Sequence, residues 1–387
     1  MDTRKEIDDL VAFPGRAPGS DAERRAARHL EERFEEIGRE AETQPVQVFP
    51  NWPLTHALHA LAGIAGSVIA VSSPFIGTLI VLVAAMSAFG DIGGSYLAVR
   101  RLTGRRASQN VVSGEESDRP GTLVLVANYD AGRTGILHGR RLNERRARIG
   151  RLLRRPLGQY EPFFWSLVLV LVCCLARLAG EDSTALTIVQ FVPTVILILY
   201  VPLFTDAGLS GVVPAANDNA AGVAGVLELA ERLDGDLEHF DLWILLAGSG
   251  TGLGLGVRAW IREFRRELDR ERTVFVELRG PGRGELAYAR REGPLVGASY
   301  HPLLVELCEE LGLPSVSSRD ITGAHIARLR SFPALSLSGR DEHGLVPDSN
   351  LPSDAPARID DEALADAIDT CERLVRLIDE RVGPRLD

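Results

Sequence analysis

Four long apolar segments dominate the hydrophobic pattern of the chain, and they come in two pairs. The segments are 54–72, 74–89, 162–178 and 185–204. A Ser-Ser-Pro turn separates the first two, and a short polar turn separates the last two. A helix that crosses a membrane needs about 20 apolar residues, with a lower limit near 17. The pattern therefore predicts four transmembrane helices in two hairpins, at residues 54–99 and 162–204.

The second apolar segment is too short to cross a bilayer alone, so we expect it to continue through residues 90–99. This continuation places Asp91 near the headgroup region, and Arg177 stands at the end of the third segment. Both charges are near predicted helix ends, which favours an interfacial position over an ion path through the membrane. The alternative is a soluble protein with four buried core helices, but such apolar hairpins are rare in soluble folds.

The rest of the chain alternates between helical and strand patterns. Apolar residues recur at helical spacing between Ser20 and Gly38, and the apolar run 122–127 is typical of a fully buried strand. Further strands are expected at 45–49, 110–112, 242–247, 273–278 and 334–338, and further helices at 220–233, 256–268, 302–311 and 361–382. The alternation predicts a three-layer α/β sandwich with a mixed central sheet. Its three pieces would be 1–50, 100–160 and 205–387.

The distribution of arginine orients the two hairpins. The segment 100–161 contains 14 arginines and six acidic residues. The turns at the other ends of the hairpins contain no basic residue unless Arg177 is counted. Because an excess of Lys and Arg in short loops marks the cytoplasmic face, we expect a multi-pass protein of the cell membrane. The α/β domain and both termini would then lie in the cytoplasm.

Composition and charge narrow the classes of function. The 387 residues include 53 acidic and 43 basic residues, which give a formal charge of −10. This balance excludes a nucleic-acid-binding protein with a wholly basic surface. Residues 1–10 are charged and lack the apolar core of a signal peptide. The four cysteines are too few and too scattered for a disulfide scaffold or a zinc ribbon, so we expect a reduced protein.

Polar and glycine-rich loops follow the predicted strands in a recognisable order. They read RAPGS at 16–20, VANYD at 126–130, ANDNAAG at 216–222, LLAGSGTGLGLG at 245–256 and NLPSD at 350–354. This series resembles the zinc-dependent aminopeptidase family, the twenty-eighth metallopeptidase family, whose relatives include glutamate carboxypeptidases. The NDNAAG element at the start of a helix is the most specific part. The resemblance covers nearly all of the chain outside the hairpins and implies a zinc-exopeptidase-like fold.

The resemblance also implies a site with two zinc ions about 3.5–4 Å apart, which activate a bridging water. In the family, five ligands and a general-base glutamate come from the strand-end loops. The position of the first histidine ligand holds Asn128 here, and the position of the last holds Asn350. The adjacent glutamate pair is replaced by Gly250 and Thr251, and a later aspartate ligand is replaced by Arg279.

Two acidic positions of the family motif are retained in this chain. Asp130 matches the aspartate that orients the first histidine, and Asp218 matches the metal-bridging aspartate, with Asn217 and Asn219 beside it as further candidates for the cleft. A zinc ion needs about four His, Cys or carboxylate donors, and Asp218 is the only retained ligand position. We therefore expect no bound zinc and no peptidase activity. If Arg279 fills the vacated position, it should pair with Asp218 or Asp130, because an unpaired buried charge is costly.

A different alignment of the loops would leave other donors to rebuild a site. The candidates are His138, His343, Glu277, Asp320, Asp341 and Glu342. Against this alternative, His343 precedes Asn350 by seven residues, and no adjacent pair of glutamates follows the strand at 242–247. The glycines of the LLAGSGTGLGLG loop have the wrong spacing for a dinucleotide-binding loop, so we interpret them as packing residues.

Eight arginines fall in the stretch that begins at Arg140 and ends at Arg155. We expect a helix on the membrane surface that contacts anionic lipid headgroups. Its apolar residues would turn into the bilayer: Leu142, Ile149, Leu152 and Leu153. The alternative is that these charges only set the topology. Since the connection from Asp130 to Asp218 contains the whole second hairpin, the cleft should lie near the bilayer surface.

The sequence therefore favours a membrane-anchored homologue of zinc aminopeptidases that has lost its metal site. We expect a cytoplasm-facing binding or scaffold protein that holds a peptide, another membrane protein or a small ligand. Two alternatives stay open. One is a membrane-bound hydrolase or metallopeptidase with a rebuilt site that uses Asp130, Asp218 and a displaced His or Glu. The other is an accessory subunit of a membrane transport complex.

Overall fold

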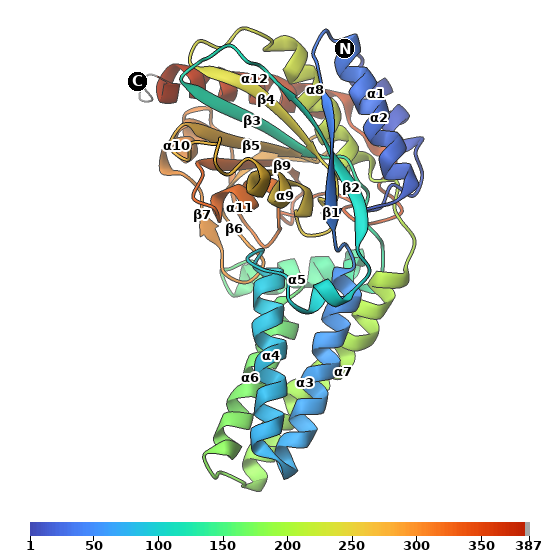
Figure 1. Ribbon diagram of the computed structural model, residues 1–387, viewed down its shortest axis with the longest axis vertical. Helices are drawn as coiled ribbons and strands as arrows, with labels where there is room; N and C mark the ends of the chain where they lie inside the picture. Colours follow the sequence, from blue (N-terminus) through green and yellow to red (C-terminus); the bar gives the residue numbers. More distant parts are fainter. Residues whose placement is uncertain (384–387) are drawn as a thin grey trace.

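The computed structural model describes residues 1–383, and its four longest apolar helices form a bundle below an α/β domain (Figure 1). The bundle contains α3 (Trp52–Ser72), α4 (Pro74–Ile92), α6 (Glu161–Leu178) and α7 (Thr184–Leu209). All four helices are long and apolar enough to cross a membrane. The two hairpins predicted from the hydrophobic pattern are therefore present, with α3 packed against both α4 and α7.

Small residues let the first two helices of the bundle approach closely. A Cβ atom on Gly77 of α4 would lie 2.5 Å from Ala70 of α3, and a Cβ atom on Gly66 would lie 2.9 Å from the Gly77 carbonyl oxygen. Close backbone approach at small residues is typical of helix packing in membranes. Large apolar side chains instead cover the outside of the bundle, where Val68, Phe75 and others are exposed.

The prediction that the second apolar helix continues to residue 99 is wrong. Helix α4 ends at Ile92, and the chain reverses at Gly93 and at Gly94, whose φ is +69°. Tyr96 then folds back over Gly90, and its hydroxyl donates a hydrogen bond to the Met86 carbonyl at 2.6 Å. The reversal leaves a helix of 19 residues, which is still long enough to cross a bilayer.

One sheet forms the centre of the α/β domain. Within residues 1–383 its strands run in the order β1-β2-β4-β3-β5-β9-β6-β7, and β8 pairs with β6. The strands are β1 (Glu42–Val48), β2 (Arg106–Gly114), β3 (Gly121–Asn128), β4 (Phe240–Ala247), β5 (Thr273–Arg279), β6 (Glu285–Glu292), β7 (Ala298–Ser299), β8 (Ser315–Ser318) and β9 (Ala334–Arg340). Strands β4, β3, β5 and β9 are parallel, whereas β1, β2, β6 and β7 add antiparallel pairs. The sheet is therefore mixed, as predicted.

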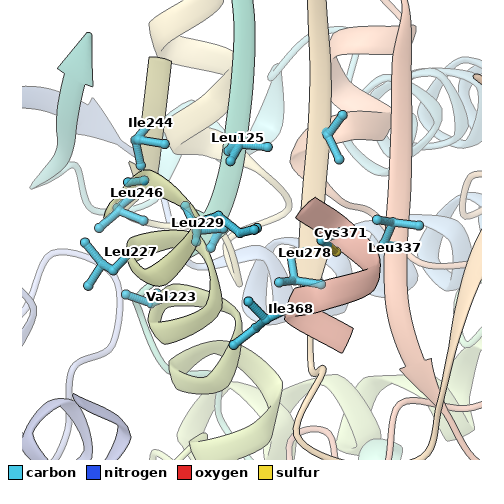
Figure 2. Packing of buried hydrophobic residues seen from close by; sticks show 14 of the residues in the cluster. Leu125, Val223, Leu227, Leu229, Ile244, Leu246, Leu278, Leu337, Ile368 and Cys371 are labelled. Carbon is cyan, nitrogen blue, oxygen red and sulfur yellow. The ribbon is translucent and has the colours of Figure 1, made fainter. Parts of the chain in front are cut away.

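Helices cover both faces of this sheet and complete the predicted three layers. One face carries α1 (Thr3–Val11), α2 (Asp21–Glu36), α8 (Gly222–Arg232), α10 (Pro302–Glu310) and α12 (Asp361–Val382). The other face carries α9 (Leu255–Glu263) and α11 (Gly323–Arg328). Figure 2 shows the hydrophobic core on the first of these faces, where Leu227 of α8 and Ile368 of α12 pack against aliphatic side chains of the strands. Each such buried side chain contributes about 1.5–3 kcal/mol.

The remaining segments join the domain to the bundle. They are η1 (Val99–Leu102), η2 (Ile136–His138), α5 (Arg140–Leu152), η3 (Ala216–Ala221) and η4 (Pro356–Arg358). Helix α5 lies across the junction, between the sheet and the upper ends of the bundle helices (Figure 1). The helix expected at 220–233 becomes regular only at Gly222, because Asp218 and Asn219 have non-helical backbone angles. That irregular turn holds the candidate site.

Candidate functional site

The predicted site residues gather where neighbouring parallel strands end. Asn128 is the last residue of β3, Arg279 is the last residue of β5, and Gly250 and Thr251 follow β4 by a few residues. The register aligns Asn128 with Ala247, so these strands end at the same edge of the sheet. Ligands of open α/β sheets bind beyond the carboxyl ends of the strands. The topology thus places these positions where a ligand site is expected.

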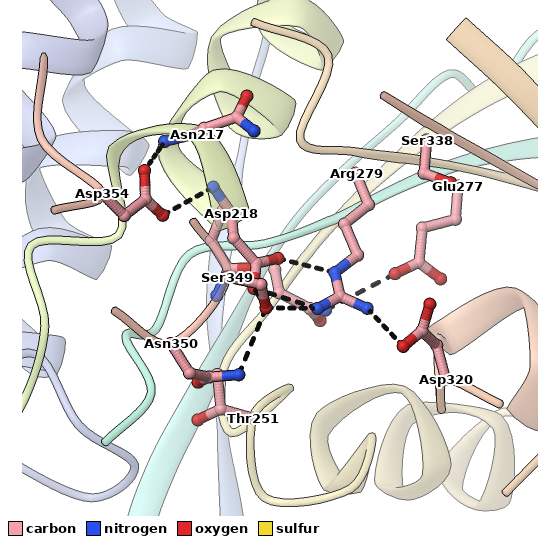
Figure 3. A network of polar contacts seen from close by, with 12 residues as sticks. Asn217, Asp218, Thr251, Glu277, Arg279, Asp320, Ser338, Ser349, Asn350 and Asp354 are labelled. Atoms are coloured by element: carbon pink, nitrogen blue, oxygen red, sulfur yellow. Dashed lines mark hydrogen bonds and ion pairs between the residues drawn. The ribbon is translucent and has the colours of Figure 1, made fainter. Parts of the chain in front are cut away.

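Arg279 and Asp218 form the centre of this cluster. The guanidinium donates from Nε to Asp218 Oδ1 at 2.6 Å and from Nη2 to Oδ2 at 2.9 Å (Figure 3). This two-pronged geometry is the strong form of a charge-assisted hydrogen bond. Both side chains are largely buried, with 16% of Arg279 and 7% of Asp218 exposed. The structure confirms that Arg279 pairs with Asp218, one of the two partners predicted from the sequence.

Further polar side chains surround the ion pair. The Ser349 hydroxyl donates to Asp218 and accepts a hydrogen bond from Arg279 Nη2 at 3.2 Å. Asn350 donates to the same hydroxyl at 3.2 Å. On the other side, Asp320 lies 3.7 Å from Arg279 Nη1 and accepts from Arg340 at 2.9 Å. Arg279 therefore lies between two carboxylates, and Figure 3 shows it in this position.

These contacts determine the charge of Asp218. Burial alone would raise the pKa of its carboxyl, but the charge of Arg279 and the hydrogen bonds from Arg279 and Ser349 outweigh burial and hold the pKa below its usual value. Asp320 behaves in the same way, because Arg340 and Arg279 lower its pKa against the effect of burial. Both aspartates are therefore ionised at neutral pH, and arginines neutralise both.

The backbone of the NDNAAG turn is fixed from behind. Asp354 accepts hydrogen bonds from the backbone N–H groups of Asn217 at 2.7 Å and Asp218 at 3.0 Å. Asn219, with a φ of +142°, donates its side-chain amide to the backbone carbonyl of Asp130. Burial raises the pKa of Asp354 to about 7. The turn that presents Asp218 is thus preorganised, and Asn217 and Asn219 are positioning residues in it.

Asp130 has a structural role in this site. Its carboxylate accepts hydrogen bonds from the backbone N–H groups of Gly250 at 2.8 Å and Thr251 at 3.0 Å, and from the Thr251 hydroxyl. The side chain is fully buried. Burial raises the pKa of Asp130 to about 6 in spite of these three donors. Asp130 therefore anchors the loop after β4 beneath the cleft.

Packing requires a glycine at position 250. A Cβ atom on Gly250 would lie 2.1 Å from Cγ of Asn128, so no side chain fits there. Gly256 of the same loop has the Gly248 carbonyl oxygen 2.0 Å from its Cβ position. Both distances support the interpretation that this loop is glycine-rich because it is tightly packed. The side chain of Asn128 therefore fills the space that a side chain at position 250 would need.

The side chains of this cluster do not fit the zinc ions that the resemblance implies. Within residues 1–383 no group of three or more His, Cys, Asp and Glu side chains is arranged to hold a metal ion. Asp218, the ligand position that the resemblance implies, directs both carboxylate oxygens to Arg279. A guanidinium in direct contact with that carboxylate opposes a dication by charge and by volume. Both oxygens of the Asp218 carboxylate are thus engaged by Arg279, and this cluster does not suit a metal ion.

A cavity of about 900 Å³ opens over the cluster and extends to the upper ends of the bundle helices. Seven of the predicted positions line it: Asn128, Asp218, Asn219, Gly250, Thr251, Arg279 and Asn350. Asp130 and Asn217 lie in the layer behind. Of the displaced donors, His138, His343 and Asp320 also line the cavity. Glu277 is instead fully buried beneath Asn128, where burial raises its pKa to about 8.

Several cavity residues were not singled out by the sequence. They are Trp52 at the start of α3, Tyr160 before α6, Arg319, Arg340 and Ser349. Trp52 and Tyr160 stand at the ends of predicted transmembrane helices, where aromatic residues are common, so their positions carried a signal. Ser349 precedes Asn350 in the chain but has no distinguishing pattern around it.

Comparison with known structures identifies the fold. A glutaminyl cyclase from Bacteroides thetaiotaomicron, solved with N-acetylhistamine bound, matches 97% of this chain over 96% of its own length, with a TM-score of 0.54 and 11% identity. An aminopeptidase from Aneurinibacillus matches 96% of this chain over 92% of its own, with a TM-score of 0.54 and 13% identity. A Zn-dependent exopeptidase from Parabacteroides distasonis matches 97% over 96%, with a TM-score of 0.52 and 10% identity. No protein-family model and no curated protein matches the sequence.

Proposed function

We propose that this chain, which has the zinc-exopeptidase-like fold that its loops predict, is a membrane-anchored, cytoplasm-facing binding protein. In it the cleft of a peptidase fold is retained without zinc or peptidase chemistry. The observation that carries this proposal is the ion pair of Arg279 with Asp218, at 2.6 and 2.9 Å. It joins the one retained ligand position to a fixed positive charge.

The surrounding contacts support a binding role for the cleft. The retained carboxylates take part in the internal structure of the site: Asp218 accepts from Arg279 and Ser349, and Asp130 accepts from the loop after β4. Asp354 fixes the turn that carries Asp218. A cleft with so many internal hydrogen bonds is preorganised, which lowers the entropic cost of binding a ligand.

The arrangement of the helices supports the proposed anchoring. The arginine-rich segment 100–161 and the α/β domain lie at the same end of the bundle, whereas the turn between α6 and α7 lies at the opposite end (Figure 1). This separation of charge follows the rule that basic loops stay in the cytoplasm. The proposed orientation therefore directs the cleft towards the cytoplasmic leaflet.

The proposal is tested by peptidase assays on the protein purified in detergent. Fluorogenic aminoacyl amides would be supplied with and without added zinc, and Asp218→Asn would serve as the matched variant. We expect the natural chain to release product no faster than this variant. Zinc-dependent release that is lost in Asp218→Asn would overturn the proposal.

The same assay tests the rebuilt-hydrolase alternative. His138 lines the cavity, and burial, with the nearby charge of Arg146, lowers its pKa to about 4, so its imidazole is neutral at pH 7. A neutral imidazole in a cleft is competent as a general base. Release that persists in Asp218→Asn but disappears in His138→Ala would favour a hydrolase.

A further inference from the structure

The cavity above the Arg279 cluster has a strong excess of positive charge. Nine arginines and two aspartates contribute to its lining. Both aspartates, Asp218 and Asp320, are already paired with arginines. Within residues 1–383, five of the lining arginines have no carboxylate within 4.0 Å: Arg106, Arg133, Arg146, Arg151 and Arg154. A concave surface with charge of one sign concentrates ligands of the opposite sign.

Arg146 of α5 is the most informative of these five side chains. It is partly buried, and it donates only to neutral groups, namely the Leu137 carbonyl oxygen at 3.0 Å and the Asn143 side chain. Burial lowers the pKa of the Arg146 guanidinium. A partly buried guanidinium that faces no carboxylate is costly, and an anionic ligand would remove much of that cost.

Part of the cavity lining is apolar and comes from the upper ends of the bundle helices and from the loop after β4. Trp52 and Pro53 begin α3, Tyr160 precedes α6, and Leu253 comes from the loop after β4. The rings of Trp52 and Tyr160 pack edge to face with centroids 5.4 Å apart. The cavity is thus cationic on the α5 side and apolar at the helix ends. Such a division suits a ligand with an anionic head and an apolar body.

Helix α5 presents different residues to the cavity and to the outside of the molecule. Arg146 and Gly150 face the cavity, whereas Ile149, Leu152 and Leu153 are exposed on its outer surface. Exposed apolar residues on an arginine-rich helix are typical of a helix that lies in the interface of a bilayer. A helix in this position would hold the cavity at the depth of the lipid headgroups.

We propose that the cavity binds a phosphate-bearing anionic amphiphile, such as an anionic phospholipid, with its phosphate at Arg146 and its apolar part against Trp52. The volume of about 900 Å³ is within the range of ligand pockets, roughly 300–1,000 Å³. This inference rests on the proposed function, since it assigns the cleft a bound ligand in place of a reaction. It names the class of ligand that the binding protein would hold.

Titration calorimetry in neutral detergent tests the inference. The probes are short-chain dihexanoyl phosphatidylglycerol, its zwitterionic phosphatidylcholine counterpart and inorganic phosphate. We expect saturable binding of the first probe, and at least about tenfold weaker binding of the other two, which corresponds to about 1.4 kcal/mol. Phosphate that binds as tightly as the lipid would overturn the assignment of an amphiphile.

Matched variants on one helix localise the binding. Arg146→Gln should weaken binding of the anionic lipid at least about tenfold, and Arg146→Lys should weaken it less. The control is Arg148→Gln, which removes the same charge from α5. Arg148 is exposed and does not line the cavity. Equal losses in both Gln variants would show surface attraction only and overturn the site. If Arg146→Gln does not fold, Arg154→Gln replaces it.

Zinc content measured on the same sample separates this inference from the proposed function. A zinc-loaded, active enzyme would overturn the proposed function whether or not the lipid binds. A zinc-free protein that binds no anionic lipid would overturn only the assignment of the ligand.

Discussion

Replacement of Arg279 with alanine tests the structural role of the ion pair. In the natural chain the guanidinium makes two hydrogen bonds to Asp218, a third to Ser349, and lies 3.7 Å from Asp320. Removal of one partner of a buried ion pair typically costs about 3–5 kcal/mol, because the other charge stays buried and unpaired. For a domain of this size each kcal/mol shifts the unfolding temperature by about 2–4 °C. We therefore expect Arg279→Ala to lower it by roughly 6–20 °C.

The pH dependence of this loss identifies its cause. Arg279 and Ser349 hold the pKa of Asp218 below its usual value against the effect of burial. In the natural chain the carboxylate therefore stabilises the fold above pH about 4, and this contribution is lost only as the pH falls below that value. Without Arg279, burial dominates and the pKa of Asp218 rises. The difference in unfolding temperature between natural chain and variant should then be largest near pH 7 and shrink towards pH 5.

Thermal unfolding in detergent, followed by intrinsic fluorescence, measures both effects. The control is Arg290→Ala, which breaks an ion pair with Glu309 that is about half exposed and worth less than about 1 kcal/mol. The second-site variant is Arg279→Ala with Asp218→Asn, which removes the unpaired charge and should regain most of the loss. Our reasoning is refuted if Arg279→Ala is no worse than Arg290→Ala, or if the double variant stays as unstable as the single one.

Three further predictions concern other parts of the molecule. Burial raises the pKa of Glu277 to about 8, so the folded state retains a proton that the unfolded state loses. The free energy of unfolding should therefore fall as the pH rises from about 5 through 8. Glu277→Gln should flatten this slope when unfolding temperatures are measured across the same pH range. Gly250→Ala should lower the unfolding free energy by about 1–3 kcal/mol, because its methyl group meets the side-chain amide of Asn128 at the end of β3. The control Gly211→Ala has open space around its Cβ and should change the unfolding free energy by less than about 0.5 kcal/mol. Equal losses in the two variants would contradict the packing argument. Single cysteines at Glu181 and Arg145 should react with an impermeant maleimide from the extracytoplasmic and the cytoplasmic side, respectively, and the opposite pattern would reverse the topology.

Much of the architecture was predictable because its signals are local. The four apolar segments needed only length and composition, and the buried run 122–127 identified β3 at the centre of the sheet. Charge predicted that Arg279 would pair with Asp218 or Asp130, once the resemblance had placed these residues in one cleft, and the structure shows the pair with Asp218. The apolar segments and β3 depend on properties that each segment carries by itself, whereas the ion pair also needed the resemblance.

Other elements were missed because their signals are weak or non-local. Strand β6 lacks the alternation of a half-buried strand, since Ala287, Tyr288 and Ala289 are all buried while the next two residues are exposed arginines. Helix α11 has six residues, too few for a helical period to appear. The length of α4 was overestimated because the chain reverses at Gly93 and Gly94. The contact between Tyr96 and Gly90 that accompanies this reversal is tertiary and leaves no pattern in the sequence.

The cavity itself was beyond the reach of sequence patterns. It combines the start of α3, the arginine-rich helix α5, the turn at Asp218 and the loop at Asn350, which are far apart in the chain. The packing of Gly250 against Asn128 likewise depends on the register of β3 and β4. Such contacts are fixed by tertiary structure, and no single segment contains them.

Zinc stoichiometry tests the central claim most directly. The protein would be purified in detergent without chelator, equilibrated with zinc and passed over a desalting column before elemental analysis. We predict far less than one zinc ion per chain, with no difference between the natural chain and Asp218→Asn. The reason is that Arg279 is hydrogen-bonded to both oxygens of the carboxylate that a metal would need. One or two zinc ions per chain, lost in Asp218→Asn, would contradict the account.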